Sequence, residues 1–301
     1  LLTNVGTSSN DRHTRNFYDD RGLLRYTLDP MLVPVEYDYD NMGNLTGTIA
    51  YAGSINSTST YTLSYVQSQI TSTGLSTNAN NRNTWAIYDT ASNLLDFAID
   101  ANGGVTQYAY DSMGREVKQI AYATTRSTTS LPSLSTMNSW ATTHTSDAGN
   151  RISRMVYDQA GELVYTVDPL GYVTEYRYDG DGRVYLQIRY PGQYTVTDSV
   201  TQASLAAQIG SIPADAEQTS YTYTVDGQLA SETAGYTSAE AATTSFTYDG
   251  RGNRVTTTDP NGNVSYAFYD AAGRATLQID ANGYATATSY TATGAVASVT
   301  H

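Results

Sequence analysis

The residues of this sequence that could do chemistry are mostly aspartates, and they recur in one motif, Tyr-Asp-x-x-Gly. The complete copies are Tyr18–Gly22, Tyr39–Gly43, Tyr110–Gly114, Tyr157–Gly161, Tyr178–Gly182, Tyr248–Gly252 and Tyr269–Gly273. Recurring carboxylates could bind a hard cation such as calcium or take part in acid–base catalysis. The same spacing is typical of turns, in which Asp accepts backbone hydrogen bonds and Gly takes a left-handed conformation.

Two stretches resemble fragments of oxygen-rich calcium loops, Asp38-Tyr-Asp40-Asn-Met-Gly43 and Asp179-Gly-Asp181-Gly. A complete loop of this kind needs a longer series of oxygen ligands that ends in a Glu, and neither stretch has one. Turn chemistry accounts for the same residues, so we predict no metal site. Calcium remains the alternative, and it would require that a chelator lower the melting temperature.

Other catalytic groups are sparse. The three histidines are His13, His144 and His301, and none lies beside a serine nucleophile motif. No glycine-rich phosphate loop follows a strand and opens a helix. The absence of Cys excludes disulfides, thiolate zinc sites and cysteine nucleophiles. The sequence therefore predicts no catalytic residue, no cofactor-binding residue and no enzymatic activity.

Charge and hydropathy narrow the classes of partner. The chain has 301 residues, with 16 Lys and Arg against 29 Asp and Glu, a net charge of −13. This argues against nucleic acid, which requires clustered basic residues. No stretch approaches the roughly 20 apolar residues of a membrane helix, so no membrane insertion is expected. No signal peptide is visible. Because the chain starts at Leu1 and stops at His301 in mid-repeat, we expect a piece of a longer protein.

The elements that carry the aspartates are expected to be β-hairpins. A second motif, Asp-Pro/Ala-x-Gly, alternates with the first at Asp100–Gly103, Asp168–Gly171, Asp259–Gly262 and Asp280–Gly283. A first copy at Asp29 has lost the Gly, and imperfect Tyr-Asp copies stand at Tyr88, Tyr223 and Tyr290. The segments between turns are rich in Tyr, Thr and Val and have the length of strands. Each unit of about 21 residues is therefore predicted to form one hairpin.

The 27 tyrosines raise a second question. Tyr172, Tyr176 and Tyr178 share one face of their predicted strand, because side chains alternate. Rows of this kind are more typical of a packing ladder between neighbouring hairpins than of glycan contact. Three glycosylation acceptor patterns, at Asn44, Asn56 and Asn263, carry little weight in a chain so rich in Ser and Thr.

A longer period of about 70 residues lies over the hairpin repeat. It gives units of approximately 17–87, 88–156, 157–222 and 223–301 within a single array, 1–301. Ser/Thr-rich inserts occupy approximately 52–84, 123–150 and 191–217. Matching apolar pairs four residues apart, Val66/Ile70, Met137/Ala141 and Leu205/Ile209, favour a short helix in each insert, near 61–71, 131–142 and 198–210. Asp198 is the expected N-cap of the third helix. An ordered loop is the alternative in each case.

The combined pattern closely resembles the Rhs, or YD-repeat, family, best over 151–190 and 246–290. That family includes bacterial polymorphic toxins, C components of insecticidal toxin complexes, and teneurins. The resemblance implies an all-β array of about ten hairpins that winds into a spiral sheet, as a shell or a tube. In the toxins, the resemblance further implies a shell that encloses a cytotoxic C-terminal segment and that ends in a core region which cuts off this cargo. No such core region is visible here.

Two functional hypotheses follow. The first is a non-enzymatic scaffold, a segment of a shell that encapsulates and delivers a toxin. The second is an extracellular adhesin or filament-forming protein that binds a partner protein or a glycan. Both place the protein outside the cell or on its surface. Expected partners are neighbouring repeats or copies end to end, an enclosed toxin cargo, or a glycan or cell-surface protein.

Overall fold

The computed structural model describes residues 13–126 and 128–301 of the chain. Twenty strands are assigned in these residues. They are β1 (Arg15–Tyr18), β2 (Leu24–Leu28), β3 (Pro34–Tyr39), β4 (Leu45–Ala50), β5 (Arg82–Tyr88), β6 (Leu95–Ile99), β7 (Val105–Tyr110), β8 (Glu116–Ala121), β9 (Arg151–Tyr157), β10 (Leu163–Val167), β11 (Tyr172–Tyr178), β12 (Val184–Gln193), β13 (Glu217–Tyr223), β14 (Leu229–Ala234), β15 (Ala242–Tyr248), β16 (Arg254–Thr258), β17 (Val264–Tyr269), β18 (Ala275–Ile279), β19 (Ala285–Tyr290) and β20 (Val296–Thr300). The helices are α1 (Leu63–Ser72), α2 (Leu134–His144) and α3 (Gln202–Ile209), with a 3-10 turn, η1, at Leu75–Thr77.

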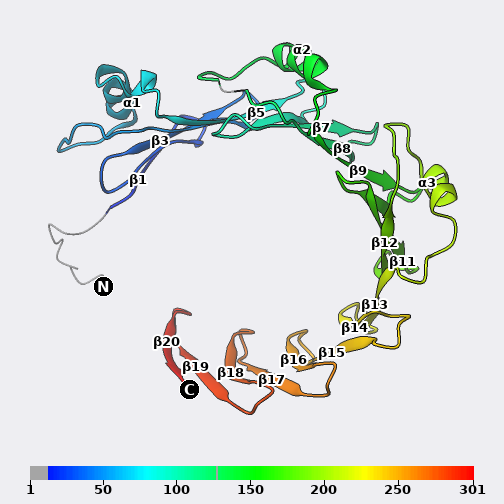
Figure 1. Cartoon of the computed structure of the whole chain (residues 1–301). Coiled ribbons are helices and arrows are strands. Elements are labelled where there is room, and N and C mark those ends of the chain that lie inside the picture. Colours follow the sequence, from blue (N-terminus) through cyan, green and yellow to red (C-terminus); the bar gives the residue numbers. More distant parts are fainter. Residues whose placement is uncertain (1–12, 127) are drawn as a thin grey trace. The chain divides into compact units, whose positions relative to one another are not determined.

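The chain divides into two compact units, Leu1–Ser153 and Arg154–His301. In the first unit β1–β8 form a continuous meander, in which each strand pairs antiparallel with the next. The second unit begins within β9, and the strands from β9 to β20 pair in the same way. The predicted all-β array of about ten hairpins with short helical inserts is confirmed (Figure 1).

Both predicted motifs form turns, but only the Tyr-Asp hairpins have a register shift beside the turn. In the turn after β11, the Gly182 N–H donates to the Asp179 carbonyl and Asp179 N–H donates to the Arg183 carbonyl. Gly182 has φ of 74°, the left-handed conformation that closes such a hairpin. Every Tyr-Asp hairpin also has a register shift next to its tyrosine, as between Arg177 and Tyr178. The Asp-Pro/Ala hairpins show no such shift. A β-bulge increases the local twist, so the extra twist is introduced at the strand ends that carry the Tyr-Asp turns.

Two turns lack glycine at the left-handed position and keep the turn nonetheless. In the first Asp-Pro turn Leu32 has φ of 65°, and in the imperfect copy after Tyr88 Asn93 has φ of 59°. Asn tolerates this conformation, whereas Leu pays a steric cost. Leu32 packs against the first apolar core, and its carbonyl accepts from the Ile55 N–H at 2.9 Å. Contacts with the first insert therefore stabilise Leu32 in a conformation that leucine rarely adopts.

All three inserts contain the predicted helix rather than a loop. Thr62, Ser133 and Thr201 are the N-caps, and each side-chain oxygen accepts from a backbone N–H three residues on. The prediction that Asp198 caps α3 is wrong, because Thr201 and Ser204 form a capping box there instead. Asp198 forms an ion pair with Arg154 at 2.8 Å. Gly210 is the C-cap of α3, at the end of the range predicted for this helix.

The helices bury one face of the sheet. Val66, Met137 and Leu205, one from each helix, are fully buried. Each packs in its own apolar cluster with residues of the neighbouring hairpins, for example Phe97 with Met137 and Ile188 with Leu205. No residue from 217 to 301 is buried to this degree, and no helix of the described chain lies along β13–β20 (Figure 1). The apolar core is therefore confined to the part of the array that has inserts.

Candidate interaction surfaces

The recurring aspartates are fully engaged by their own turns. One carboxylate oxygen of Asp179 accepts from the Asp181 N–H at 2.9 Å and the Arg183 N–H at 3.0 Å. The other accepts from the Arg183 side chain at 2.9 Å. The Arg183 side chain and then its backbone N–H lower the pKa of the Asp179 carboxyl below its usual value. The carboxylate therefore stays ionised and holds the turn, as the sequence predicted.

The two stretches weighed as calcium loops follow the same geometry. The Asp40 carboxylate accepts from the N–H groups of Met42 and Asn44, each at 2.9 Å, and from the Asn44 side chain at 2.8 Å. In residues 13–126 and 128–301 no three His, Asp or Glu side chains come together as a metal-binding group. Of the other carboxylates in these stretches, Asp38 pairs with Arg25 at 2.8 Å and Asp181 with Arg183 at 2.7 Å.

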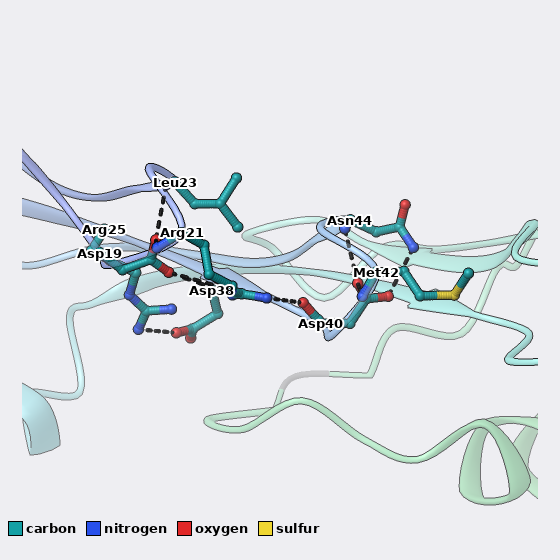
Figure 2. Close-up of polar contacts among 8 residues, drawn as sticks. All are labelled: Asp19, Arg21, Leu23, Arg25, Asp38, Asp40, Met42 and Asn44. Atoms are coloured by element: carbon teal, nitrogen blue, oxygen red, sulfur yellow. Dashed lines mark hydrogen bonds and ion pairs between the residues drawn. The ribbon is translucent and has the colours of Figure 1, made fainter.

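Neighbouring Tyr-Asp turns also contact one another. Figure 2 shows the turns of Asp19 and Asp40, which belong to successive hairpins in the first unit. The Arg21 side chain donates to the Asp40 carbonyl at 2.9 Å, so it links the two turns directly. Arg25 forms an ion pair with Asp38 at 2.8 Å from the same pair of hairpins. The Tyr-Asp turns thus form a row at one end of the strands.

The turn tyrosines form the predicted packing ladder, and hydrogen bonds reinforce it. The Tyr178 hydroxyl donates to the Leu163 carbonyl, which lies opposite Tyr157 in the preceding Tyr-Asp hairpin. Five more tyrosines repeat this contact, with all six distances between 2.7 and 2.9 Å: Tyr110, Tyr223, Tyr248, Tyr269 and Tyr290. Arg183 and Arg274 also lie over the rings of Tyr223 and Tyr290. We call the sheet face that carries these tyrosines the tyrosine face.

Two hollows interrupt the tyrosine face. Two residues before the turn tyrosine, six hairpins carry a large side chain: Tyr37, Tyr108, Met155, Tyr176, Tyr221 and Phe246. Strands β5 and β17 carry Ala86 and Ala267 there. A cavity of about 310 Å³ includes Ala86, Ala98 and Thr84 in its lining, and one of about 340 Å³ includes Ala267 and Ser265. At both hollows the residue two positions before the turn tyrosine is alanine, a signal that the aligned repeats already contain.

The opposite face, which we call the helix-side face, contains a polar cluster under each helix. Glu175 is 8% exposed and accepts a short hydrogen bond from the Tyr190 hydroxyl. Its other oxygen pairs with Arg177 at 2.6 Å. We call four successive strands with the helix that follows them a module: β1–β4 with α1, β5–β8 with α2, and β9–β12 with α3. In the first module, Glu36 accepts from Tyr51 and, at 2.8 Å, from Tyr26. Both carboxylates are paired with an arginine, Glu175 with Arg177 and the partly buried Glu36 with Arg25, as charges shielded from water require.

Burial and the adjacent carboxylates raise the pKa of the tyrosines in these clusters. Desolvation is the main cause at Tyr26, Tyr51 and Tyr190, followed by the interaction with Glu36 or Glu175. The middle module has a neutral version, in which Tyr122 donates to Gln107 at 2.6 Å and Phe97 takes the place of Tyr26. These clusters were missed from the sequence, although the 15-residue spacing of Glu36/Tyr51, Gln107/Tyr122 and Glu175/Tyr190 could have revealed them.

The histidines are placed apart, and two of them have partners. His144 at the end of α2 bonds Asp147 at 2.7 Å and stacks on Trp140, with the ring centroids 4.5 Å apart. Asp147 also accepts from Thr124 at 2.6 Å, which ties the two ends of the second insert together. His301 bonds Thr286 at 3.1 Å, and His13 is exposed. The structure does not bring the three together.

The helix-side face changes character from β13 onward, and the sequence did not lead us to predict this. On β13–β16 it carries hydroxyl side chains that bond across strands: Thr222 to Ser231 at 2.7 Å, Thr233 to Thr243 at 2.9 Å, and Thr247 to Thr256 at 2.6 Å. On β17 it carries Tyr266 and Phe268, which are 44% and 49% exposed. This face is therefore solvated where no insert covers it.

These features define the class of protein: an antiparallel array of β-hairpins, joined by Asp-Gly turns and a tyrosine ladder. A model of the RHS repeat matches residues 157–195 and 233–264. Three related solved structures share the fold over 97% of this chain: TcdB2-TccC3 with Cdc42 (16% identity, TM-score 0.57), TcdB2-TccC3 without its hypervariable C-terminal region (17%, 0.57) and TcdB2-TccC3 (16%, 0.56). No curated protein sequence matches.

The chain is similar to the Rhs/YD-repeat family: two of its stretches match the repeat model, and its fold is that of the solved Rhs-type chains. It spans 13% of the length of the solved chains that share its fold. Among the described residues, no helix is long and apolar enough to span a membrane.

Proposed function

We propose that this chain is a non-enzymatic wall segment of a secreted Rhs-type shell that encapsulates a toxin polypeptide. The observation that carries the proposal is the likeness of 97% of the chain to the fold of TcdB2-TccC3. The architecture supports it, because each hairpin pairs with the next and bonds to it through tyrosine hydroxyls. Such an array extends by repetition, as a wall must.

We further propose that the tyrosine face is the one that meets the enclosed polypeptide. The chain's own helices occupy the other face along much of the array, for example where Leu205 is buried under α3. The tyrosine face has the hollows at Ala86 and Ala267, which could accept side chains of a polypeptide. Aromatic rings with engaged hydroxyls supply a large contact area at low entropic cost.

Electron microscopy of the intact native protein tests the shell. A closed hollow particle with internal density is the expected result. A continuous rod or tube with an axial repeat would overturn the proposal in favour of a filament or adhesin.

A photo-crosslinking residue tests which face meets the cargo. It is placed at Ala86 on the tyrosine face, or at Ser245 on the helix-side face as the matched control. We expect crosslinks to the enclosed polypeptide from Ala86 and few from Ser245. The reverse pattern would show that the cargo meets the other face while leaving the shell itself intact.

A further inference from the structure

A hollow of about 490 Å³ lies in the first unit, where the first insert ends and the second insert begins. Its lining comes from the end of the first insert, from β5, from the turn after β6 and from the start of the second insert, and includes Asn81, Asn83, Trp85, Asp100 and Thr128. Asn83 and Trp85 alternate along β5 with residues of the tyrosine face, so the hollow lies on the helix-side face. Its volume is in the range of small-molecule sites.

Hydrogen bonds within the chain fix the walls of this hollow. Trp85 is 5% exposed, and its indole N–H donates to the Thr128 carbonyl at 3.2 Å. The Asn81 side chain accepts from the Ala52 N–H at 2.9 Å and donates to the Leu75 carbonyl at 2.7 Å. These contacts hold both inserts in place without a ligand, so the hollow is preformed.

Asn83 presents a buried acceptor that the protein leaves unused. Its side-chain oxygen Oδ1 is buried and has no hydrogen-bond partner. Its amide nitrogen faces the Thr128 carbonyl at 3.5 Å, so rotating the amide by half a turn would bring two oxygens together. The third module has Ile152 at the same position, five residues before the turn tyrosine. The repeat therefore does not require an amide here, and an unpaired buried acceptor costs stability.

Arg126 presents an unused donor at the same junction. In the part of the chain that the structure describes, its Nε is the other buried side-chain polar atom without a hydrogen-bond partner. Arg126 lies at the start of the second insert, and its backbone N–H donates to the Gly103 carbonyl at 2.6 Å. Gly103 belongs to the lining of the hollow. Both unpaired atoms thus belong to segments that border one hollow.

The charged groups at this junction indicate the class of ligand. Asp100 uses one carboxylate oxygen for its own turn, in which it accepts from the N–H groups of Asn102 at 2.7 Å and Gly104 at 2.9 Å. Its second oxygen is left for a ligand. One carboxylate beside one guanidinium favours a ligand without net charge.

We propose that this hollow binds one ring of a neutral saccharide. The ligand must donate to the oxygens of Asn83 and Asp100 and accept from the Nε–H of Arg126. A hydroxyl group does both, and adjacent hydroxyls of a sugar ring serve two acceptors at once. A peptide group has a single N–H and serves only one. The site is independent of the proposed shell, because it lies on the face opposite to the one proposed for the cargo.

Substitution of Asn83 tests the proposal in a chain that stays folded. Asn83→Ile in the full chain installs the residue that the third module has at this position. Because it removes an unpaired buried acceptor, the melting temperature should stay the same or rise. Binding of glucose, galactose, mannose and N-acetylglucosamine is measured by ligand-observed NMR. We expect at least one of these sugars to bind the native chain saturably, and Asn83→Ile to weaken that binding about tenfold.

Two further variants make the result specific. Arg126→Lys keeps the positive charge but lacks the Nε–H of the guanidinium, and it should also weaken binding. Arg82→Gln is the matched control, because it changes the residue of β5 next to Asn83, whose side chain points to the opposite face. It should bind the same sugar with the affinity of the native chain.

Four outcomes would overturn the proposal. None of the four sugars could bind the native chain. Asn83→Ile could leave the affinity unchanged, or it could lower the melting temperature by several degrees, which would make Asn83 a purely structural residue. N-methylacetamide could bind more tightly than every sugar, which would make the hollow a site for a polypeptide. None of these results bears on whether the intact protein forms a shell.

Discussion

The stretch β9–β12 with α3 and the stretch β13–β20 belong to the same compact unit, yet they are stabilised differently. Both use the same Asp-Gly turns and the same tyrosine ladder. The first also buries an apolar cluster around Leu205 and Ile188, both 0% exposed, whereas the second has no residue buried to a comparable degree. The turns and the tyrosine hydrogen bonds therefore define the repeat, whereas the inserts add the apolar core.

The largest expected difference concerns the core. Leu205→Ala removes a fully buried side chain from the cluster under α3 and should lower the free energy of unfolding by about 3 kcal/mol. Phe268→Ala removes a larger but half-exposed side chain from β17 and should cost less than about 1 kcal/mol. Urea denaturation of both variants measures the contrast. Equal losses would mean that β17 is covered in solution by an element of the chain itself.

Alkaline pH should weaken the covered modules. Folding raises the pKa of Tyr26, Tyr51 and Tyr190, so their contribution to stability is complete below the unfolded pKa near 10 and declines above it. The decline is about 1.4 kcal/mol for each group per pH unit above 10. Melting temperatures measured between pH 8 and 11 should therefore fall above pH 10. Tyr190→Phe should flatten this fall, and a fall that the substitution leaves unchanged would contradict the assignment.

Turn substitutions should affect both stretches equally. Gly182 and Gly273 have φ of 74° and 73°, and a Cβ at either would lie 3.4 Å from one side-chain oxygen. Alanine at each should cost about 1–2 kcal/mol, because a side chain disfavours the left-handed conformation. Chemical denaturation of the two variants provides the comparison. A clearly smaller cost at Gly273 would show that β17–β18 is already loose in the native protein.

The tyrosine hydrogen bonds should contribute equally to the stability of β9–β12 and of β13–β20. Tyr178 and Tyr269 donate to carbonyls of the preceding hairpin at 2.8 and 2.9 Å. Tyr178→Phe and Tyr269→Phe should each cost about 1 kcal/mol, the net value of one hydrogen bond. Hydrogen exchange of the amides in the two affected hairpins locates the loss. Exchange that changes across the whole unit instead would argue against a local ladder.

The smallest effect is expected on the open hydroxyl rows. Thr247 bonds Thr256 across β15 and β16 at 2.6 Å, and both side chains are in contact with solvent. Thr247→Val should change the free energy of unfolding by less than about 0.5 kcal/mol, as is typical of surface positions. The control is Thr247→Ala, which tests strand propensity without the branched shape. A loss above about 1 kcal/mol in the valine variant would mean that the row is buried by a partner.

Much of the fold could be predicted from the sequence because its signals are local. An Asp-x-x-Gly turn needs only five consecutive residues, as in Asp179–Arg183, so the turns follow from composition and spacing alone. The helices in the inserts could also be predicted, because apolar residues such as Leu205 and Ile209 lie one helical turn apart. The prediction of Asp198 as the N-cap is wrong, since Asp198 pairs instead with Arg154. Arg154 is 44 residues away in the chain, so the local sequence does not reveal this contact.

The ten hairpins, their turns and the tyrosine row follow from residue types and spacing alone, because they depend on contacts within one or two repeats. The same spacing carries the resemblance to the Rhs repeat. Which face each helix covers, and the exposure of Tyr266 and Phe268, became clear only from the folded chain (Figure 1). The physical reason is that alternation assigns side chains to two faces without saying which face is buried. Burial depends on whether an insert folds back over the strands, and that is settled by packing between segments distant in the chain.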